Sequence, residues 1–396
     1  MNRDILAKEV QEFLRDNLEK QATDVALDKS PFANVSSQEL AQQIEGWQKC
    51  AKKLPTWAYH PDIYYPKRIH IEQASSEHTA LLKQNLIKPD SRVIDLTAGM
   101  GVDVAYFAQV SKQVVYCELN EDLVEIAKYN SQTLGLDNIE FINQDSIAYL
   151  ESCEDRSFDY IFVDPSRRNQ GQRKFLLDEC EPNILEHQEL FFKKATTVLT
   201  KLSPLLDIKS LINQLDYLNK VIIVSVDGEC KELLCIQVKG YIGEPSIQAI
   251  RLFKEFMQDY TFTFSEEKEA KITFGEPQDW IYIPDASLLK AGAFKSVARS
   301  FELKKLSKNT HLYTSGKRKS DFPGRTIQVL MKMTFREFKK MGKKRPIHKA
   351  NVVVRNFPIK AEELQKRYKI KAGMNDYLIF TSDSKGNQWV LFGILN

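Results

Sequence analysis

Apolar positions at helical spacing mark the first 55 residues of the chain. Leu6, Val10, Phe13 and Leu14 recur every three to four positions, which is the period of an amphipathic helix. A second predicted helix follows residues 36–39, where Ser and Glu have the spacing of an N-cap. The pattern therefore predicts a helical N-terminal region.

Tyrosines, prolines and histidines then replace the helical pattern over residues 57–69, which predicts a loop or lid. Four aromatic side chains there are candidates for stacking on a base or, equally, for packing in a core: Trp57, Tyr59, Tyr64 and Tyr65. Residues 72–77 are expected to open a helix that runs to Leu86, directly before the first strand of a sheet, and Ser75 or Ser76 is expected to cap it.

Short apolar runs alternate with helical periods from about residue 88 to 240. The seven runs that predict strands are residues 93–95, 114–117, 141–145, 158–163, 197–201, 221–226 and 233–238. Helical periods between them, such as residues 123–130 and 211–218, favour crossovers between parallel strands. The expected fold class is therefore α/β, with a Rossmann-like sheet.

Residues beyond 240 predict smaller α+β structure. Apolar and polar positions alternate in the segments expected as strands, which are residues 261–264, 271–274, 280–283, 310–314, 326–333, 349–357, 376–381 and 388–393. Helices are expected over residues 286–301, 335–341 and 360–368.

A glycine turn after the first strand of the sheet points to a ligand site. The run ending in Asp95 is followed by Gly99 and Gly101, which permit positive φ and close approach of backbone to a ligand. The second run ends in Glu118, where an acid can hold a ribose diol. A third glycine at the spacing of nicotinamide-dependent oxidoreductases is lacking, since position 104 is Val.

Four acids each end an apolar run: Asp95, Glu118, Asp145 and Asp164. In a doubly wound sheet these strand ends form one crevice that binds ligands. The pattern Asp-x-x-x-Gly-x-Gly resembles motif I of class I S-adenosylmethionine-dependent methyltransferases. That resemblance implies a seven-stranded sheet and the cofactor S-adenosyl-L-methionine. The cofactor-binding residues that it implies are Asp95, Thr97, Gly99, Gly101, Glu118, Asp145 and Gln73, with Asp145 at the adenine and Gln73 or Ser75 near the methionine end.

The sequence Asp164-Pro165-Ser166-Arg167-Arg168 follows the fourth strand. Enzymes that methylate base amines often have Asp/Asn-Pro-Pro-aromatic here, so this segment is closer to the Asp-Pro-Pro-Arg of some RNA methyltransferases. We expect Asp164 and Arg167 to be catalytic, with Asp164 accepting a hydrogen bond or a proton. Arg168 is a candidate substrate ligand, and structural ion pairs are the alternative for both arginines. Methylation of a pyrimidine carbon needs a cysteine nucleophile, for which Cys180 and Cys230 lack a recognisable context.

The whole pattern resembles a family of poorly characterised bacterial proteins that carry a THUMP-like C-terminal domain. The resemblance rests on residues 72–76, 95–103 and 164–168 and on the C-terminal segment 349–396. True THUMP domains bind RNA, so RNA is implied by analogy. The expected domains are an N-terminal helical region and lid (1–87), the cofactor-binding domain (88–240), an α+β, ferredoxin-like domain (241–330) and the basic THUMP-like domain (331–396).

Charge is unevenly distributed along the chain. Residues 285–396 contain 25 lysines and arginines and 8 aspartates and glutamates, a balance of +17 within a chain of net charge +3. Two clusters are the candidate RNA ligands: Lys317, Arg318 and Lys319, and Lys343, Lys344 and Arg345. The alternative is that these lysines only keep a small domain soluble.

The composition and the cysteine content narrow the possible classes of protein. No apolar run is long enough to span a bilayer, and residues 1–10 lack the apolar centre of a signal peptide. Six scattered cysteines predict a reducing cytoplasm and no metal site. We therefore expect a cytoplasmic S-adenosylmethionine-dependent methyltransferase of RNA, with no membrane or metal partner. The alternatives are a methyltransferase of proteins or small metabolites, and an RNA-binding module with a vestigial cofactor site.

Overall fold

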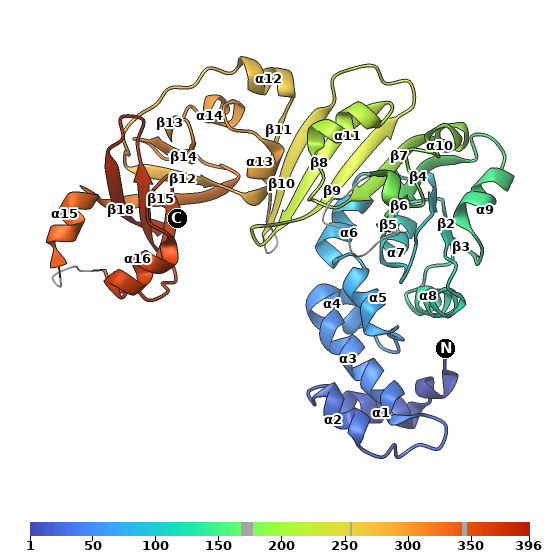
Figure 1. The fold of residues 1–396 in the computed structure, drawn as a ribbon. Coiled ribbons are helices and arrows are strands. Elements are labelled where there is room, and N and C mark those ends of the chain that lie inside the picture. Colours follow the sequence, from blue (N-terminus) through green and yellow to red (C-terminus); the bar gives the residue numbers. More distant parts are fainter. Residues whose placement is uncertain (168–176, 254–255, 343–346) are drawn as a thin grey trace. The chain divides into compact units, whose positions relative to one another are not determined.

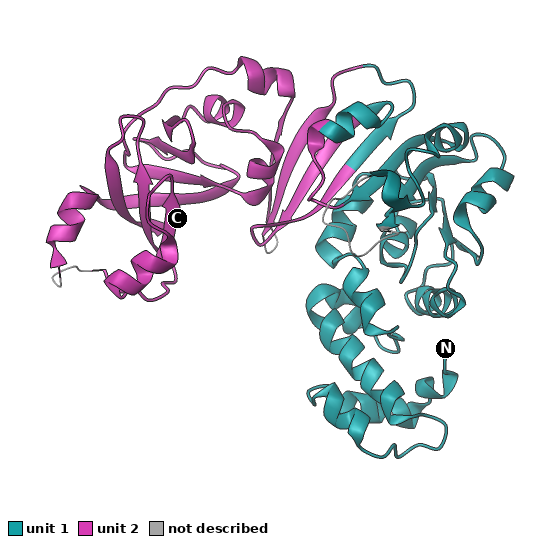
Figure 2. Ribbon diagram, viewed as in Figure 1, with its two compact units in different colours: residues 1–202, 210–218, 235–242 teal, residues 203–209, 219–234, 243–396 magenta. Residues whose placement is uncertain are grey.

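The computed structural model describes residues 1–167, 177–253, 256–342 and 347–396. The chain divides into two compact units, shown in Figure 2. Unit 1 comprises residues 1–202, 210–218 and 235–242, and unit 2 comprises residues 203–209, 219–234 and 243–396. Three elements carry residues of both units: α11 (Ile208–Gln214), β8 (Leu218–Val226) and β9 (Glu229–Val238).

Unit 1 begins with the predicted helical region (Figure 1). Its elements are η1 (Arg3–Leu6), α1 (Lys8–Asp16), α2 (Ala22–Leu27), α3 (Ser37–Lys53), α4 (Pro55–Ala58), α5 (Arg68–Gln73) and α6 (Glu77–Gln84). The predicted cap is present: the hydroxyl of Ser36 accepts the N–H of Glu39, and the carboxylate of Glu39 accepts the N–H of Ser36. Val10 and Leu14 bury one face of α1, as their spacing predicts.

A parallel sheet follows in unit 1, with the strand order β7-β4-β1-β2-β3. The strands are β1 (Arg92–Asp95), β2 (Gln113–Cys117), β3 (Ile139–Ile142), β4 (Phe158–Val163) and β7 (Ala195–Leu202). The helices between them are α7 (Val102–Ala108), α8 (Glu121–Thr133), α9 (Ser146–Ser152) and α10 (Gln188–Lys194), with η2 at Leu177–Glu179. A short antiparallel pair joins β5 (Ser166–Arg167) to β6 (Cys180–Glu181).

The other strands, among them β8 and β9 that carry residues of both units, form two sets. The first has the order β11-β10-β8-β9, and the second is a seven-stranded sheet with the order β13-β14-β12-β15-β18-β17-β16. The further strands are β10 (Ser246–Phe253), β11 (Phe256–Phe262), β12 (Trp280–Pro284), β13 (Lys304–Ser307), β14 (Thr310–Ser315), β15 (Gly324–Thr334), β16 (Asn351–Arg355), β17 (Asp376–Ser382) and β18 (Gln388–Leu395). The helices are α12 (Phe264–Glu269), α13 (Ala286–Ala291), α14 (Ser296–Ser300), α15 (Phe335–Lys340) and α16 (Ala361–Tyr368).

The expected fold class is confirmed: each of the seven runs predicted between residues 88 and 240 overlaps a strand, and the C-terminal part is small α+β structure. The third strand, however, ends at Ile142, three residues before its predicted end at Asp145. Three further local predictions were wrong. The helix expected over residues 286–301 is two helices, because Gly292 ends α13 in a left-handed conformation with φ +80°. Residues 271–274 form only an isolated bridge, and Phe264 starts α12 instead of ending a strand.

The domain division remains a prediction. Its boundary between residues 330 and 331 falls inside β15, so the segments on either side share one sheet. Among the described residues, no helix combines the length and apolar character needed to cross a membrane.

Candidate functional site at the carboxyl edge of the unit 1 sheet

The glycine turn after β1 has the backbone conformation that glycine permits. Gly99 and Gly101 have φ of +52° and +84°, and Gly101 is the N-cap of α7. A Cβ atom on Gly101 would lie 3.3 Å from the Cβ of Ala127 and 3.4 Å from the ring of Tyr116. The hydroxyl of Tyr116 donates to the carbonyl of Gly99 at 2.6 Å. The turn is therefore fixed by its conformation, by its packing and by this hydrogen bond.

A hydrogen-bonded chain joins the ends of β1 and β4. The carboxylate of Asp95 accepts the N–H of Thr97 at 2.8 Å and its hydroxyl at 3.2 Å. The hydroxyl oxygen of Thr97 accepts the N–H of Asp164 at 2.7 Å. Asp95 is 1% exposed, and burial, followed by the nearby charges of Asp103 and Asp164, raises its pKa well above the ordinary value. This chain brings three of the predicted site residues together.

Glu118, at the end of β2, faces the same turn. One oxygen of its carboxylate accepts the N–H of Gly99 at 3.1 Å, and the other accepts the N–H of Asn120 at 2.9 Å. The amide of Asn143 donates to the carbonyls of Glu118 and Leu119, at 2.9 and 3.0 Å. The acid predicted at the ribose is therefore held in place, and Asn143 is a supporting residue that no motif indicated.

The other two predicted cofactor residues lie at helix ends. Asp145 is exposed and caps α9, where its carboxylate accepts the N–H of Ala148 at 2.8 Å. Gln73 is exposed at the last position of α5. Capping of α9 accounts for an aspartate at position 145 without any ligand. The contact of Asp145 with adenine therefore stays a prediction, and so does the contact of Gln73 with the methionine end of the cofactor.

A buried polar cluster beside the turn was not predicted. Lys83 is fully buried, and its ammonium lies 2.7 Å from the carboxylate of Asp103 and 2.5 Å from the hydroxyl of Ser75. Ser75 also donates to Asp103 at 2.7 Å. The cluster ties α6 to α7, which gives Ser75 a structural partner, whereas the cap of α6 is Ser76. A lysine on an amphipathic helix carries no sequence signal for burial.

Asp164 has an unexpected cationic partner. The ammonium of Lys201 lies 2.5 Å from its carboxylate, and the two side chains are 16% and 34% exposed, respectively. Lys201 is on β7, which pairs with β4 so that Thr200 lies opposite Val163. The sequence predicted this strand but gave Lys201 no role.

Lys53, at the end of α3, adds a second cation near the same edge. Its ammonium donates to the carbonyls of Ile71 and Glu72, both at 2.8 Å. Burial and the charge of Lys201 lower the pKa of Lys53 to about 8. Helices α3 and α5 are thus joined close to the strand ends.

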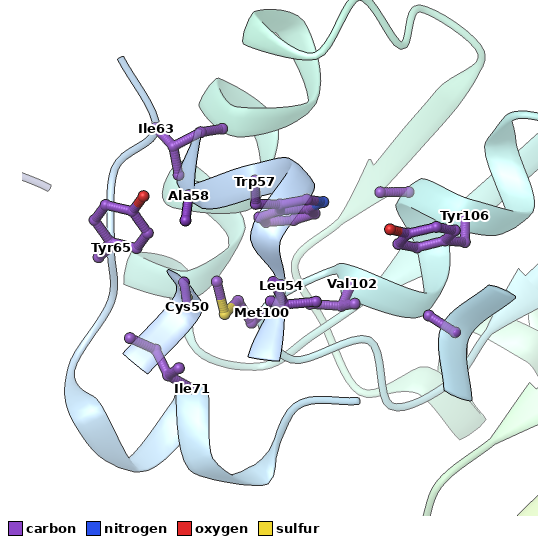
Figure 3. Close-up of a cluster of buried hydrophobic side chains, with 12 residues drawn as sticks. Cys50, Leu54, Trp57, Ala58, Ile63, Tyr65, Ile71, Met100, Val102 and Tyr106 are labelled. Carbon is purple, nitrogen blue, oxygen red and sulfur yellow. The ribbon is translucent and has the colours of Figure 1, made fainter. Parts of the chain in front are cut away.

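The N-terminal helices pack directly on the glycine turn. Figure 3 shows Trp57 and Ile71 in one apolar cluster with Met100 and Val102, which flank Gly101. Trp57, Tyr64 and Tyr65 are each at most 5% exposed, so these three aromatic rings pack in cores. Only Tyr59, at 74% exposure, is available for stacking among the four aromatic candidates.

Several predicted substrate residues lie outside the described residues, namely Arg168, Lys343, Lys344 and Arg345. The backbone of Arg167 pairs with Cys180 in the antiparallel β5–β6 pair. Cys180 is 1% exposed, and burial raises the pKa of the partly buried Cys230 to about 11. In the described part of the chain, no three His, Cys, Asp or Glu side chains are grouped as metal ligands.

The basic loop in unit 2 is anchored to the seven-stranded sheet. The hydroxyl of Tyr282 accepts the N–H of Lys319 at 2.8 Å and donates to the carbonyl of Lys317 at 3.3 Å. Lys317 and Arg318 are exposed, whereas the ammonium of Lys319 pairs with Glu302. The three predicted RNA ligands therefore differ: two are displayed and one has an acidic partner.

Three family models match successive parts of the chain. A methyltransferase domain matches residues 87–224, a ferredoxin-like domain matches residues 280–323, and a THUMP domain-like model matches residues 326–393.

Relatives extend this picture. The crystal structure of a candidate methyltransferase from Porphyromonas gingivalis W83 is 30% identical, covers 99% of this chain and 98% of its own, and superposes with a TM-score of 0.89. An uncharacterised S-adenosylmethionine-dependent methyltransferase of Mycobacterium tuberculosis is 20% identical over 83% of this chain and 88% of its own. A 23S rRNA uracil C5 methyltransferase of Xanthomonas axonopodis pv. citri is 33% identical over 121 residues, which are 29% of this chain and 27% of that enzyme.

Proposed function

The chain belongs to the family of the Porphyromonas gingivalis candidate methyltransferase, in which a methyltransferase domain precedes ferredoxin-like and THUMP-like domains, and we propose that it transfers a methyl group from S-adenosyl-L-methionine to RNA. The observation that carries this proposal is the chain of hydrogen bonds from Asp95 through Thr97 to Asp164. It places the acid expected at the acceptor beside the turn expected at the cofactor.

The residues at the turn fit S-adenosylmethionine, which supplies an electrophilic methyl group when bound. A Cβ atom on Gly99 would meet only the carbonyl of Thr97, at 3.9 Å, so the backbone there is open to close approach. Glu118 would accept the ribose hydroxyls, because each carboxylate oxygen keeps a lone pair beyond its backbone hydrogen bond. Asp145 would contact the adenine and Gln73 the methionine end.

On the acceptor side, Asp164 would bind the N–H or O–H group that receives the methyl. The ammonium of Lys201 lies beside the carboxylate of Asp164, which can accept a hydrogen bond and, during the reaction, a proton. Arg167 would act beside it, and Arg168 would hold a phosphate. We favour a nitrogen or oxygen acceptor over a pyrimidine carbon, because four of the six cysteines are buried and the other two partly buried.

RNA as the substrate is supported by charge and by the matched part of the rRNA methyltransferase. The balance of +17 over residues 285–396 suits a polyanion, and both basic clusters, 317–319 and 343–345, are proposed to contact phosphates. A cytoplasmic location and the four-domain division given above belong to the same proposal.

The experiment that tests this proposal compares modified nucleosides by mass spectrometry. RNA from cells with and without the gene is digested, and one methylated nucleoside should be lost without the gene and restored by a plasmid copy. A copy with Asp164→Ala should not restore it. Identical nucleoside profiles would contradict RNA as the substrate and favour a protein or a small metabolite.

A further inference from the structure

One cross-strand row on the seven-stranded sheet of unit 2 lies at the surface. Trp280 on β12 pairs with Gln328 on β15, which pairs with Ile394 on β18. Residues paired in this way point to the same face of a sheet. Trp280 is partly exposed, Gln328 is exposed, and Ile394 is 40% exposed. Leu330, in the bulge of β15, is 53% exposed.

The same face is covered on both sides of this row. Tyr282 lies two positions from Trp280 and therefore on the same face, and it is fully buried against Phe322. Val390, which shares the face of Ile394, packs in a cluster with Phe335 and Phe338 of α15. Trp280, Gln328 and Ile394 thus form an open strip between two covered regions.

A basic side chain lies over the aromatic end of the strip. The guanidinium of Arg318 is 5.9 Å from the centroid of the Trp280 ring, and Arg318 is exposed. Its loop is held by the hydrogen bonds of Tyr282 and by the hydroxyl of Ser315, which donates to the carbonyl of Lys317 at 2.5 Å. The loop therefore presents cations at a fixed place beside an aromatic ring.

We propose that the open strip binds an unpaired nucleotide of RNA, with its base stacked on Trp280 and its phosphates on Arg318 and Lys317. This proposal rests on RNA being the substrate. Charge favours RNA as the occupant, because the surrounding residues 285–396 carry the balance of +17. An aromatic face beside a guanidinium suits a base and its phosphate. Bases within a duplex are already stacked on each other, so the strip selects single strands.

Trp389 provides a matched control. It also lies under a basic side chain, with the ammonium of Lys332 at 5.6 Å from its ring centroid. It packs against the cluster that contains Ile281, the neighbour of Trp280, and so belongs to the opposite face of the sheet. Its indole N–H donates to Asp383 at 2.9 Å.

The test is fluorescence anisotropy of the full-length protein with a labelled ten-nucleotide oligouridylate and with an RNA duplex of the same length. Trp280→Leu should weaken binding of the single strand by about tenfold or more, as loss of one base–aromatic stack does. Trp280→Phe should retain most of the affinity, and Trp389→Leu should match the wild type. Arg318→Ala should lower the slope of log affinity against log salt by about 0.7.

The outcomes separate the two proposals. If the wild-type protein binds no RNA at low salt, the RNA substrate itself is contradicted. If it binds RNA and Trp280→Leu binds equally well, only the open strip is contradicted. Equal loss with Trp389→Leu, or equal loss for the duplex, would also overturn the strip. If circular dichroism shows that Trp280→Leu is unfolded, the other two variants decide the proposal. Retained RNA affinity in Trp280→Phe and a lower salt slope in Arg318→Ala would support it.

Discussion

The carboxyl edge of the unit 1 sheet and the basic face of unit 2 are built in opposite ways. At the edge, Asp95, Glu118 and Asp164 are acids tied to backbone N–H groups or to a lysine. On the face of unit 2, Lys317 and Arg318 are exposed on a loop whose backbone is anchored by the hydroxyl of Tyr282. The difference indicates two kinds of recognition: fixed positions for a small cofactor and its reacting atom, and displayed charge for a large, variable polyanion.

The largest effect is expected at the edge, from Asp164→Ala. Removing the carboxylate leaves the acceptor without its hydrogen-bond partner, so methyl transfer should fall by about 10²- to 10⁴-fold. Affinity for S-adenosylmethionine, measured by calorimetry, should change little. The control is Asp155→Ala, which removes an exposed acid of the same unit. Full turnover by Asp164→Ala would show that this acid is structural.

Glu118→Ala should give the next largest effect, which is a loss of affinity for S-adenosylmethionine. Hydrogen bonds to a charged group contribute about 1.5–3 kcal/mol each, so loss of the carboxylate should weaken cofactor binding by at least tenfold. Glu140→Ala, at an exposed position on β3, is the control. Unchanged calorimetric affinity in folded Glu118→Ala would refute the ribose assignment.

A smaller effect is expected on the basic face, where the triple variant Lys317→Ala, Arg318→Ala, Lys319→Ala tests displayed charge. Each phosphate contact contributes roughly 0.7 to the salt slope of single-strand binding. Because Lys319 pairs with Glu302, the slope should fall by about 1.4, the value for two contacts. Replacing the exposed Lys8, Arg15 and Lys20 of unit 1 by Ala should leave the slope unchanged. An unchanged slope in the first variant would remove this loop from the RNA interface.

The smallest effect is expected on the free energy of unfolding, from the buried carboxyl group of Asp95. The raised pKa of buried Asp95 means that the folded protein holds this proton to higher pH than the unfolded chain, whose carboxyl titrates near 3.8. The group's contribution to stability therefore falls as pH rises from 3.8 towards the raised pKa. Asp95→Asn should remove this fall, so that its free energy of unfolding changes less between pH 5 and pH 7 than that of the wild type. Urea unfolding at pH 5 and pH 7 measures it, and an unaltered pH dependence would contradict the pKa direction.

The sequence was sufficient where the signal was local. A strand, two glycines and a helix fix the turn at Gly99 and Gly101 within a few residues, and the structure has that turn. Lys83 and Lys201 could not be predicted, because their partners, Asp103 and Asp164, are distant along the chain. Charge counts likewise predicted a basic region but could not show that Lys319 has an acidic partner.

In the C-terminal part, too, features that depend on contacts between distant residues could not be predicted from the sequence. The helix expected over residues 286–301 was predicted through Gly292, although a glycine at that point permits the left-handed end of α13. The open strip could not be predicted either, since Trp280, Gln328 and Ile394 come from three strands and meet only through sheet register.

The most direct test of the central claim is transfer of a tritiated methyl group from S-adenosylmethionine to RNA. Total RNA from cells that lack the gene is incubated with the full-length protein, and label is counted separately in RNA, protein and small molecules. We predict label in RNA with the wild type and with Asp155→Ala, and none with Asp164→Ala. Label confined to the protein or small-molecule fraction, or equal labelling by Asp164→Ala, would contradict the account.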